Sequence, residues 1–280
     1  MWKTTSYSLP LGSMTHPRRD RVQSLDRALD VLEALGEAGD LGVSEVAART
    51  GLVVSTAHRL LAGLADRGYV RQAASHGRYA LGFKVLELAG GIQARSAALR
   101  AVARVHLEGI REETSETTNL VILDRDRVVY VDQVPGLHNV RMFTQVGSSA
   151  LAHTTASGKA MLASRPADVI TKLYPPEREP LERLTPHTQT TLAGLRRDFA
   201  RIRRRGYAID NEEHEEGVSC VAAPVFAGGV AFAAISISAP TTRIVQADTG
   251  ELGRLLRRHA AELSAMLGDG IVDQSLSGVW

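Results

Sequence analysis

The chain of 280 residues has one cysteine, Cys220, which excludes an intramolecular disulfide and a zinc site built from several thiolates. It has no stretch close to the roughly 20 apolar residues that span a bilayer. Its first 21 residues contain no apolar segment of signal-peptide length. These absences predict a cytoplasmic protein without a membrane segment, whose residues 1–21 form a flexible basic arm.

A large charge imbalance is also missing, because 33 basic and 31 acidic residues leave a net charge of only +2. The distribution is more informative than the total. Six basic residues and one acid, Asp66, lie between Arg49 and Lys84, which gives this segment a net charge of +5. Concentrated positive charge is typical of a nucleic-acid-binding segment. The length and the hydrophobic content of 44% fit a soluble protein of two domains.

Three short helices are expected after the basic arm. The first begins at a capping Ser24 and ends before Gly39, the second runs from about 43 to 50, and the third ends before Gly68. The expected apolar faces are Leu25, Ala28, Leu29, Leu32 and Leu35 in the first helix, Val46 and Ala47 in the second, and Ala57, Leu60, Leu61 and Leu64 in the third. The second and third helices, separated by a turn at Gly51, predict a helix-turn-helix.

A short hairpin follows the third helix, with strands at 69–72 and 78–81 and a turn at 75–77, and it predicts a wing. In a winged helix-turn-helix the third helix presents its first residues to the major groove, where arginine can bind guanine through two hydrogen bonds. The predicted DNA contacts are Arg27, Ser55, Thr56, His58, Arg59, Arg71, Arg78 and Tyr79. A core position is an equal alternative for Tyr79.

The rest of the chain changes its pattern. Residues 83–113 favour helix, with a break expected at Gly90 and Gly91. Beyond them, "TTNLVILD", "RVVYVDQV", "VRMFTQVG", "CVAAPVF" and "VAFAAISIS" predict strands, and "LAGLRRDFARIRRR" predicts a helix whose arginines are solvated. Antiparallel strands with helices on one side make an α+β domain.

One stretch, "HTTASGKAML" at 153–162, could suggest phosphate binding or nucleophilic catalysis. A phosphate loop needs glycine and serine or threonine where this chain has His153 and Ala160. A nucleophile elbow around Ser157 would need glycine where Thr155 stands, and no acid and base accompany it at a known spacing. We therefore expect neither chemistry, and we expect Lys159 to be solvated.

Several consecutive segments resemble the IclR family of bacterial transcriptional regulators. They include "VSEVAARTGLVVSTAHRLLAGLADRGYV", "GRYALGFKVLELA", "HTTASGKAMLA" and "RIRRRGYAIDNEEHEEGVSCVAAPVF", and the resemblance extends from about residue 22 to 268. It implies an α+β fold in which an N-terminal winged helix-turn-helix at 22–83 is joined by a helical linker at 84–98 to an effector-binding domain at 99–271. That domain is related to the GAF and PAS folds and has an antiparallel sheet, and residues 272–280 form a C-terminal tail.

The resemblance also implies an effector pocket. Its residues are Met142, Ala156, Ser157, Asp210, Val218, Cys220, Ser236 and Ser238. Ser236 and Ser238 are two apart on a strand, so both hydroxyls face one side and need partners, which a polar ligand or neighbouring backbone can supply. Ala156 and Ser157 fall where amides at a helix N-terminus can bind a carboxylate. Cys220 is expected to be a small buried hydrophobe.

We predict no catalytic residue, no metal and no cofactor. The acidic run "NEEHEE" at 211–216 could ligate a metal, but a solvated acidic loop is the expectation. The expected function is that of a transcription regulator, a repressor first with an activator as the alternative, and not an enzyme. Its expected partners are double-stranded DNA with a palindromic operator, an organic-acid or aromatic carboxylate effector, and further copies of the chain in a homodimer or dimer of dimers. The alternatives are an enzyme using Ser157 or Cys220 and a winged helix that contacts only protein.

Overall fold

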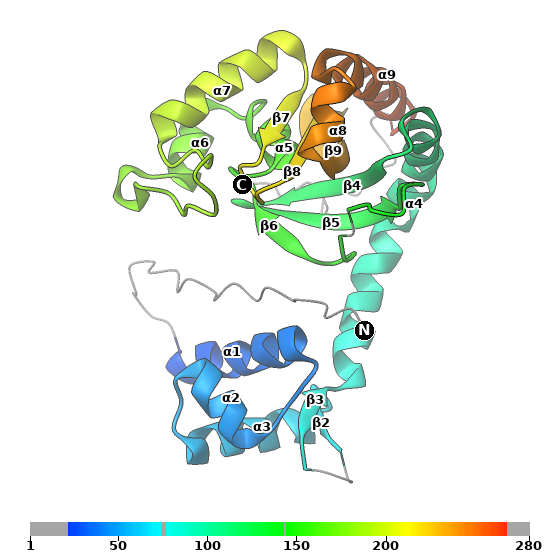
Figure 1. The fold of residues 1–280 in the computed structure, drawn as a ribbon. Coiled ribbons are helices and arrows are strands. Elements are labelled where there is room, and N and C mark those ends of the chain that lie inside the picture. Colours follow the sequence, from blue (N-terminus) through cyan, green and yellow to red (C-terminus); the bar gives the residue numbers. More distant parts are fainter. Residues whose placement is uncertain (1–21, 74–76, 143, 268–280) are drawn as a thin grey trace. The chain divides into compact units, whose positions relative to one another are not determined.

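The computed structural model describes residues 22–73, 77–142 and 144–267, and the chain divides into two compact units after Gln93 (Figure 1). The predicted arm at 1–21, the tail at 272–280 and the turn residues Ser75 and His76 lie outside the described residues. Among those described, no helix combines the length and the hydropathy needed to span a bilayer.

The first unit has the three predicted helices and the predicted hairpin. The helices are α1 (Gln23–Ala38), α2 (Val43–Thr50) and α3 (Val54–Asp66), and the hairpin strands are β2 (Val70–Gln72) and β3 (Tyr79–Leu81). A strand that we did not predict, β1 (Asp40–Leu41), pairs antiparallel with β3, so the sheet order is β1-β3-β2. The core consists of Val31, Ala34, Leu35, Leu41, Val46, Ala47, Ala57, Leu61, Val70 and Tyr79.

Two expectations for α1 are wrong. Its N-cap is Val22 and not Ser24, which lies within the first turn. Its apolar face is buried only in the C-terminal half, while Leu25 and Leu29 are 57% and 47% exposed. The rest of the unit covers only that half of the helix, whereas the helical spacing of the leucines continues beyond it. Gly39 ends the helix as predicted, with a φ of 83°.

The second unit contains a six-stranded antiparallel sheet of order β6-β5-β4-β9-β8-β7. The strands are β4 (Thr117–Asp124), β5 (Arg127–Val134), β6 (Ser149–Leu151), β7 (Ala208–Asn211), β8 (Val218–Ala227) and β9 (Val230–Pro240). The segment "VRMFTQVG" at 140–147 is not a strand in its described part, and β6 follows it instead.

Helices cover both faces of this sheet, which corrects the expectation of helices on one side (Figure 1). α4 (Phe83–Thr114), α8 (Thr241–Gln246) and α9 (Thr249–Leu267) lie on one face, and α5 (Ala156–Leu162), α6 (Ala167–Leu173) and α7 (Leu192–Arg205) lie on the other. A short 3-10 helix, η1 (Pro176–Arg178), follows α6. β9 shows why two layers are needed: Ile235 and Ile237 join the core under α4 and α9, while Ala234 joins the core under α5 and α7.

The break predicted in the linker region does not occur, because α4 continues through Gly90 and Gly91 as one helix of 32 residues. A glycine inside a helix costs only about 1 kcal/mol relative to alanine. The hydrogen bonds of the turns on both sides of the pair outweigh that cost. The second half of α4 is further held by Leu99, Ala103, Leu107 and Ile110, which are buried in the core.

Candidate DNA-binding surface and effector site

The first turns of α3 carry the side chains predicted to contact bases. Ala57 and Leu61 are fully buried and fix this helix on the unit. The opposite side leaves Ser55, His58 and Arg59 exposed, as predicted, with Thr56 half-buried beside them. Arg27, on α1, is half-buried.

Two residues at the start of α3 were missed in the sequence. Val53 is its N-cap and Val54 its first residue, and they are 67% and 52% exposed. Large apolar side chains at the exposed start of a recognition helix suit contacts with thymine methyl groups. The valine pair in "GLVVST" could have indicated this, because nothing in the local helical pattern buries it.

The wing corrects one predicted DNA contact and gives a second one partners within the protein. Tyr79 is only 5% exposed and belongs to the core, so the alternative given for it is the right one. Arg78 forms ion pairs with Asp40 Oδ1 at 3.2 Å and Glu45 Oε2 at 2.9 Å, and also donates to the Asp40 carbonyl. Arg78 therefore ties β3 to β1 and α2. Arg71 on β2 is exposed.

The free positive charge of this unit is smaller than the sequence count suggested. Besides the ion pairs of Arg78, Arg49 Nη1 forms an ion pair with Glu37 Oε2 at 3.9 Å. Lys84 Nζ forms one with Glu87 Oε1 at 2.8 Å. In the described part of the unit, the basic residues of the segment that have no acidic partner are Arg59, Arg67 and Arg71. Positive charge therefore remains on α3 and the adjoining wing strand.

A row of polar side chains crosses five neighbouring strands of the second unit, from β5 to β7. Its register pairs are Gln133 with Asn119, Asn119 with Ser236, Ser238 with Cys220, and Cys220 with Asp210. The row lies on the sheet face that α5 and α7 cover. Asn119, Ser236 and Asp210 are at most 2% exposed.

Asn119 is the centre of this row. Its Nδ2 donates to Ser238 Oγ at 3.1 Å and to Ser236 Oγ at 3.4 Å, and its Oδ1 accepts from Gln133 Nε2 at 3.0 Å. Cys220 Sγ donates to Ser238 Oγ at 3.2 Å. The serine oxygens thus accept from side chains of neighbouring strands, and their hydroxyl hydrogens stay available to donate. An asparagine inside the β-branched run "TTNLVILD" was the unused indication of such a side chain.

α5 packs against β8 and β9, above the row. Thr155 is its N-cap and its Oγ1 accepts from Gly158 N at 3.1 Å, so Ala156 and Ser157 lie in the first turn and are at most 4% exposed. Glycine is sterically required at position 158, because a Cβ on Gly158 would lie 2.2 Å from the carbonyl oxygen of Ala152. The first turn of α5 therefore lies on the face that carries the polar row.

The remaining predicted pocket residues lie near the ends of the β4 and β8 strands. Thr117 Oγ1 donates to the carbonyl of Met142 at 2.8 Å, and Thr117 pairs in register with Ser238. Val218 is half-buried two residues before Cys220 on β8. The structure thus brings strand and loop residues of the predicted pocket to one region.

Buried charges adjoin the row, contrary to two expectations. Lys159 is 1% exposed and forms an ion pair with Glu213, which is 8% exposed, so neither the lysine nor this part of "NEEHEE" is solvated. Glu213 N donates to Asp210 Oδ1 at 2.7 Å. Burial raises the pKa of Asp210 to about 7, although the Lys159 ammonium acts to lower it.

The same region is poorly suited to nucleophilic catalysis. Burial raises the pKa of the Cys220 thiol well above its ordinary value, which keeps it protonated. His153 Nε2 lies 3.0 Å from the carbonyl of Glu182, and its ring meets Tyr174 edge to face. Burial also lowers the pKa of His153. The histidine is held by structural contacts and the thiol is not activated.

Comparison with known families agrees with both units. A model of the IclR helix-turn-helix domain matches residues 24–74, and a model described as Bacterial transcriptional regulator IclR C-terminal matches residues 93–265. The chain belongs to the IclR family. As an IclR-family protein it is a DNA-binding transcription regulator with an α+β fold, as the sequence predicted.

Relatives of this IclR-family chain match it along most of their length. Transcriptional repressor IclR of Escherichia coli (strain K12) is 36% identical over 91% of this chain and 93% of its own. HTH-type transcriptional regulator KdgR of the same organism is 34% identical over 89% and 94%. The structure of Thermotoga maritima IclR has 32% identity and a TM-score of 0.66, covering 88% of this chain and 99% of its own.

An IclR homologue from Microbacterium hydrocarbonoxydans has been solved in complex with 4-hydroxybenzoate. It is 28% identical to this chain, with a TM-score of 0.71, and the match covers 87% of this chain and 98% of the homologue. That relative therefore binds a small aromatic carboxylate.

Proposed function

We propose that this chain represses transcription from a palindromic operator, and that a small organic acid bound at the polar row changes its operator affinity. The observation that carries the proposal is the buried row of hydrogen-bonding side chains beneath α5, in a chain whose other unit is a DNA-binding helix-turn-helix. A polar row of this kind offers hydrogen-bonding groups to a polar metabolite in a different unit from the one that binds DNA.

For DNA, the proposed base contacts come from Ser55, His58 and Arg59, with Val53 and Val54 against thymine methyl groups. Arg71 on the wing supplies a phosphate contact. These side chains are all exposed on the first unit, and the neighbouring Thr56 is half-buried. A palindrome implies two copies of α3 reading half-sites about one helical turn apart, or a multiple of it.

A dimer is supported by apolar side chains that the first unit leaves exposed. They are Val22, Leu25 and Leu29 near the start of α1, and Phe83, Leu86, Leu88 and Ile92 in α4. Leu25 and Leu29 are four apart on α1 and Leu88 and Ile92 are four apart on α4, so each pair shares one helix face, and apolar side chains that gather on an exposed face are typical of an interaction surface. We propose that a second copy of the chain covers them.

For the effector, the row offers donors that suit a carboxylate. Ser236 and Ser238 accept from Asn119, which leaves their own hydroxyl hydrogens to donate, and Gln133 has a second Nε2 hydrogen beside the one that it gives to Asn119. With a pKa of about 7, Asp210 is protonated often enough at neutral pH to donate a hydrogen bond as well. The aromatic carboxylate bound by the Microbacterium relative has this chemistry.

The test is operator affinity, measured by fluorescence anisotropy on DNA from upstream of the chain's own gene, with and without each of a panel of organic acids that includes 4-hydroxybenzoate. Allosteric couplings of about 1 to 3 kcal/mol change affinity about 5- to 150-fold, and we expect one acid to do so. Ser238→Ala and Asp210→Asn should reduce the response to that acid and leave effector-free operator binding unchanged. Thr242→Ala, an exposed hydroxyl on α8, is the control. A full response of both Ser238→Ala and Asp210→Asn to the acid would show that the effector binds outside the polar row.

A further inference from the structure

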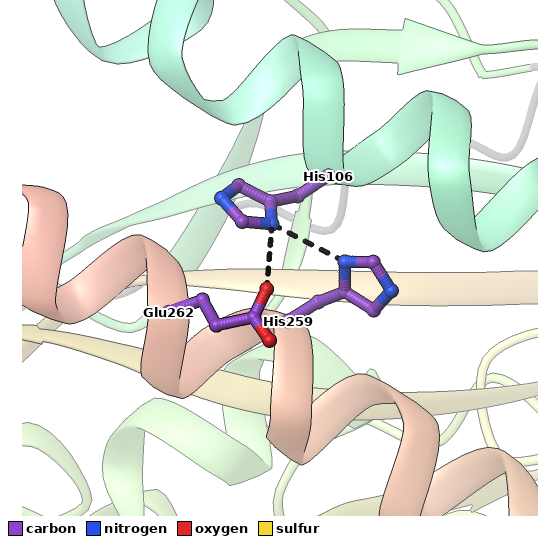
Figure 2. A group of neighbouring side chains, drawn as sticks. All are labelled: His106, His259 and Glu262. Atoms are coloured by element: carbon purple, nitrogen blue, oxygen red, sulfur yellow. Dashed lines mark hydrogen bonds and ion pairs between the residues drawn. The ribbon is translucent and has the colours of Figure 1, made fainter.

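His106, His259 and Glu262 form a cluster on the other face of the sheet, away from the polar row (Figure 2). His106 is on α4, and His259 and Glu262 are on α9. The two Nδ1 atoms lie 3.2 Å apart, and Glu262 Oε2 lies 3.8 Å from His106 Nδ1. The three ligand atoms all lie within 4.8 Å of one another. Figure 2 shows the three side chains converging between the two helices.

The packing of α4 against α9 brings these residues together. His259 and Glu262 are three apart on α9, so they share one face of that helix. Gly109 lies three residues after His106 on α4, and a Cβ there would lie 3.3 Å from Cε1 of His259. The small residue thus lets the imidazole approach the α4 backbone. Leu107 and Ile110 of α4 share the adjoining core with Leu256 and Leu263 of α9.

We propose that His106, His259 and Glu262 bind a divalent transition-metal ion of the Zn²⁺ class. Tetrahedral zinc has nitrogen ligands at about 2.0–2.1 Å, which places neighbouring ligand atoms about 3.3 Å apart. The Nδ1 atoms, at 3.2 Å, already have that separation. Glu262 Oε2, at 3.8 Å from His106 Nδ1 and within 4.8 Å of the other ligand atoms, is further away than this, but its side chain is 55% exposed, so the carboxylate is free to rotate inward. Water supplies the fourth ligand.

The surroundings of His259 support a metal ligand over an isolated histidine pair. Its Nε2 is buried and, among the described residues, has no hydrogen-bond partner. Glu113 Oε1 lies 3.5 Å from it and is held by Arg258 at 2.7 Å. Metal-binding histidines direct their second ring nitrogen to a carboxylate, which fixes the tautomer that leaves the other nitrogen free for the ion. A metal at Nδ1 would place the proton on Nε2, opposite Glu113.

The ion would tie α4 to α9. The sequence alone did not indicate the cluster, because His106 and His259 are 153 positions apart. The acidic run that we considered for a metal is unrelated to this cluster, since it contributes none of the three ligands.

The test uses the full chain, freed of metal with a chelator and titrated with Zn²⁺ by calorimetry and with Co²⁺ by visible absorption. We expect one ion per chain, intense d–d bands of tetrahedral Co²⁺ and a higher melting temperature with Zn²⁺. His106→Gln and His259→Gln should each abolish the bands. His187→Gln, an exposed histidine outside the cluster, should keep them.

Two milder variants keep the test decisive if a histidine variant folds poorly. Glu262→Gln changes an exposed side chain and should weaken binding, and Glu113→Gln, behind His259, should weaken it about 10- to 100-fold with the stoichiometry kept. Absence of the Co²⁺ bands in the unaltered chain would overturn the proposal. Equal metal affinity in the unaltered chain and in folded Glu262→Gln and His106→Gln would also overturn it. That result would mean that the two histidines share only a hydrogen bond.

Discussion

Lys159 has no local pattern that distinguishes it from a solvated helical lysine, yet its ammonium is buried beside Glu213. A charge in the interior is stable only where an opposite charge and hydrogen bonds compensate it. The partner lies 54 residues further along the chain and reaches Lys159 only because the loop after β7 folds back over α5. The burial of Lys159 therefore depends on the Glu213 carboxylate and not on the residues next to it in the sequence.

We expect Lys159→Met to lower the free energy of unfolding by about 3–5 kcal/mol, because it leaves the Glu213 carboxylate buried without its partner. Combining it with Glu213→Leu should restore much of the loss. Lys172→Met is the matched control: Lys172 pairs with Asp168 at 3.6 Å on the surface, so the cost should stay below about 1 kcal/mol. Urea unfolding measures all three. Equal losses at both lysines would contradict the assignment.

Asp210 should make stability depend on pH. Burial raises its pKa from 3.8 to about 7, so between those values the folded chain holds a proton that the unfolded chain has lost. That contribution is fully present below about pH 4 and disappears as the pH rises through about 7. The unaltered chain should therefore lose stability relative to Asp210→Asn between pH 5 and pH 8.

The measurement for Asp210 is urea unfolding of both proteins across that range. Lys159 and Glu213, the charged groups nearest to Asp210, are the same in both, so their own titration largely cancels in the difference. A difference that is constant with pH would show that Asp210 is ionised throughout.

Among the elements, α3 has the sharpest expected role. Its buried Ala57 and Leu61 orient Arg59 outward, and Arg59 has no acidic partner in the described residues. We expect Arg59→Ala to weaken operator binding by about 1–3 kcal/mol and to relax base preference at one position of each half-site. Arg204→Ala removes the same charge from the exposed surface of α7 and should change little. Anisotropy with operators mutated one base pair at a time measures both.

Helices α4 and α5 contain glycines with opposite roles. Nothing lies within 4 Å of a Cβ built on Gly90 or Gly91, so alanine at either site should stabilise the chain by about 0.5–1 kcal/mol through helix propensity. Gly158→Ala would force a Cβ to 2.2 Å from the Ala152 carbonyl oxygen and should cost about 1–3 kcal/mol. Chemical denaturation compares the three variants. Destabilisation by the α4 alanines would contradict the open surroundings of Gly90 and Gly91.

At the scale of the whole molecule, the two-domain organisation was predictable because each half has its own periodicity. Apolar residues recur at helical spacing before residue 70, and β-branched runs recur after residue 117. The two family models match these same two parts of the chain, at residues 24–74 and 93–265. The second layer of helices was missed, although β9 is apolar on both faces, a pattern typical of a strand that is covered on both sides.

The sequence by itself determined the helix-turn-helix, most of the strands, the exposed residues of α3 and the strand positions of Ser236, Ser238 and Cys220. Those features follow from spacing within one segment, which the backbone geometry of helices and strands converts directly into faces. The tertiary structure alone decided the burial of Lys159, the ion pairs of Arg78, the place of Asn119 in the polar row and the meeting of His106 with His259. Each depends on a partner distant in the chain, and only the packing of complete elements brings such partners together.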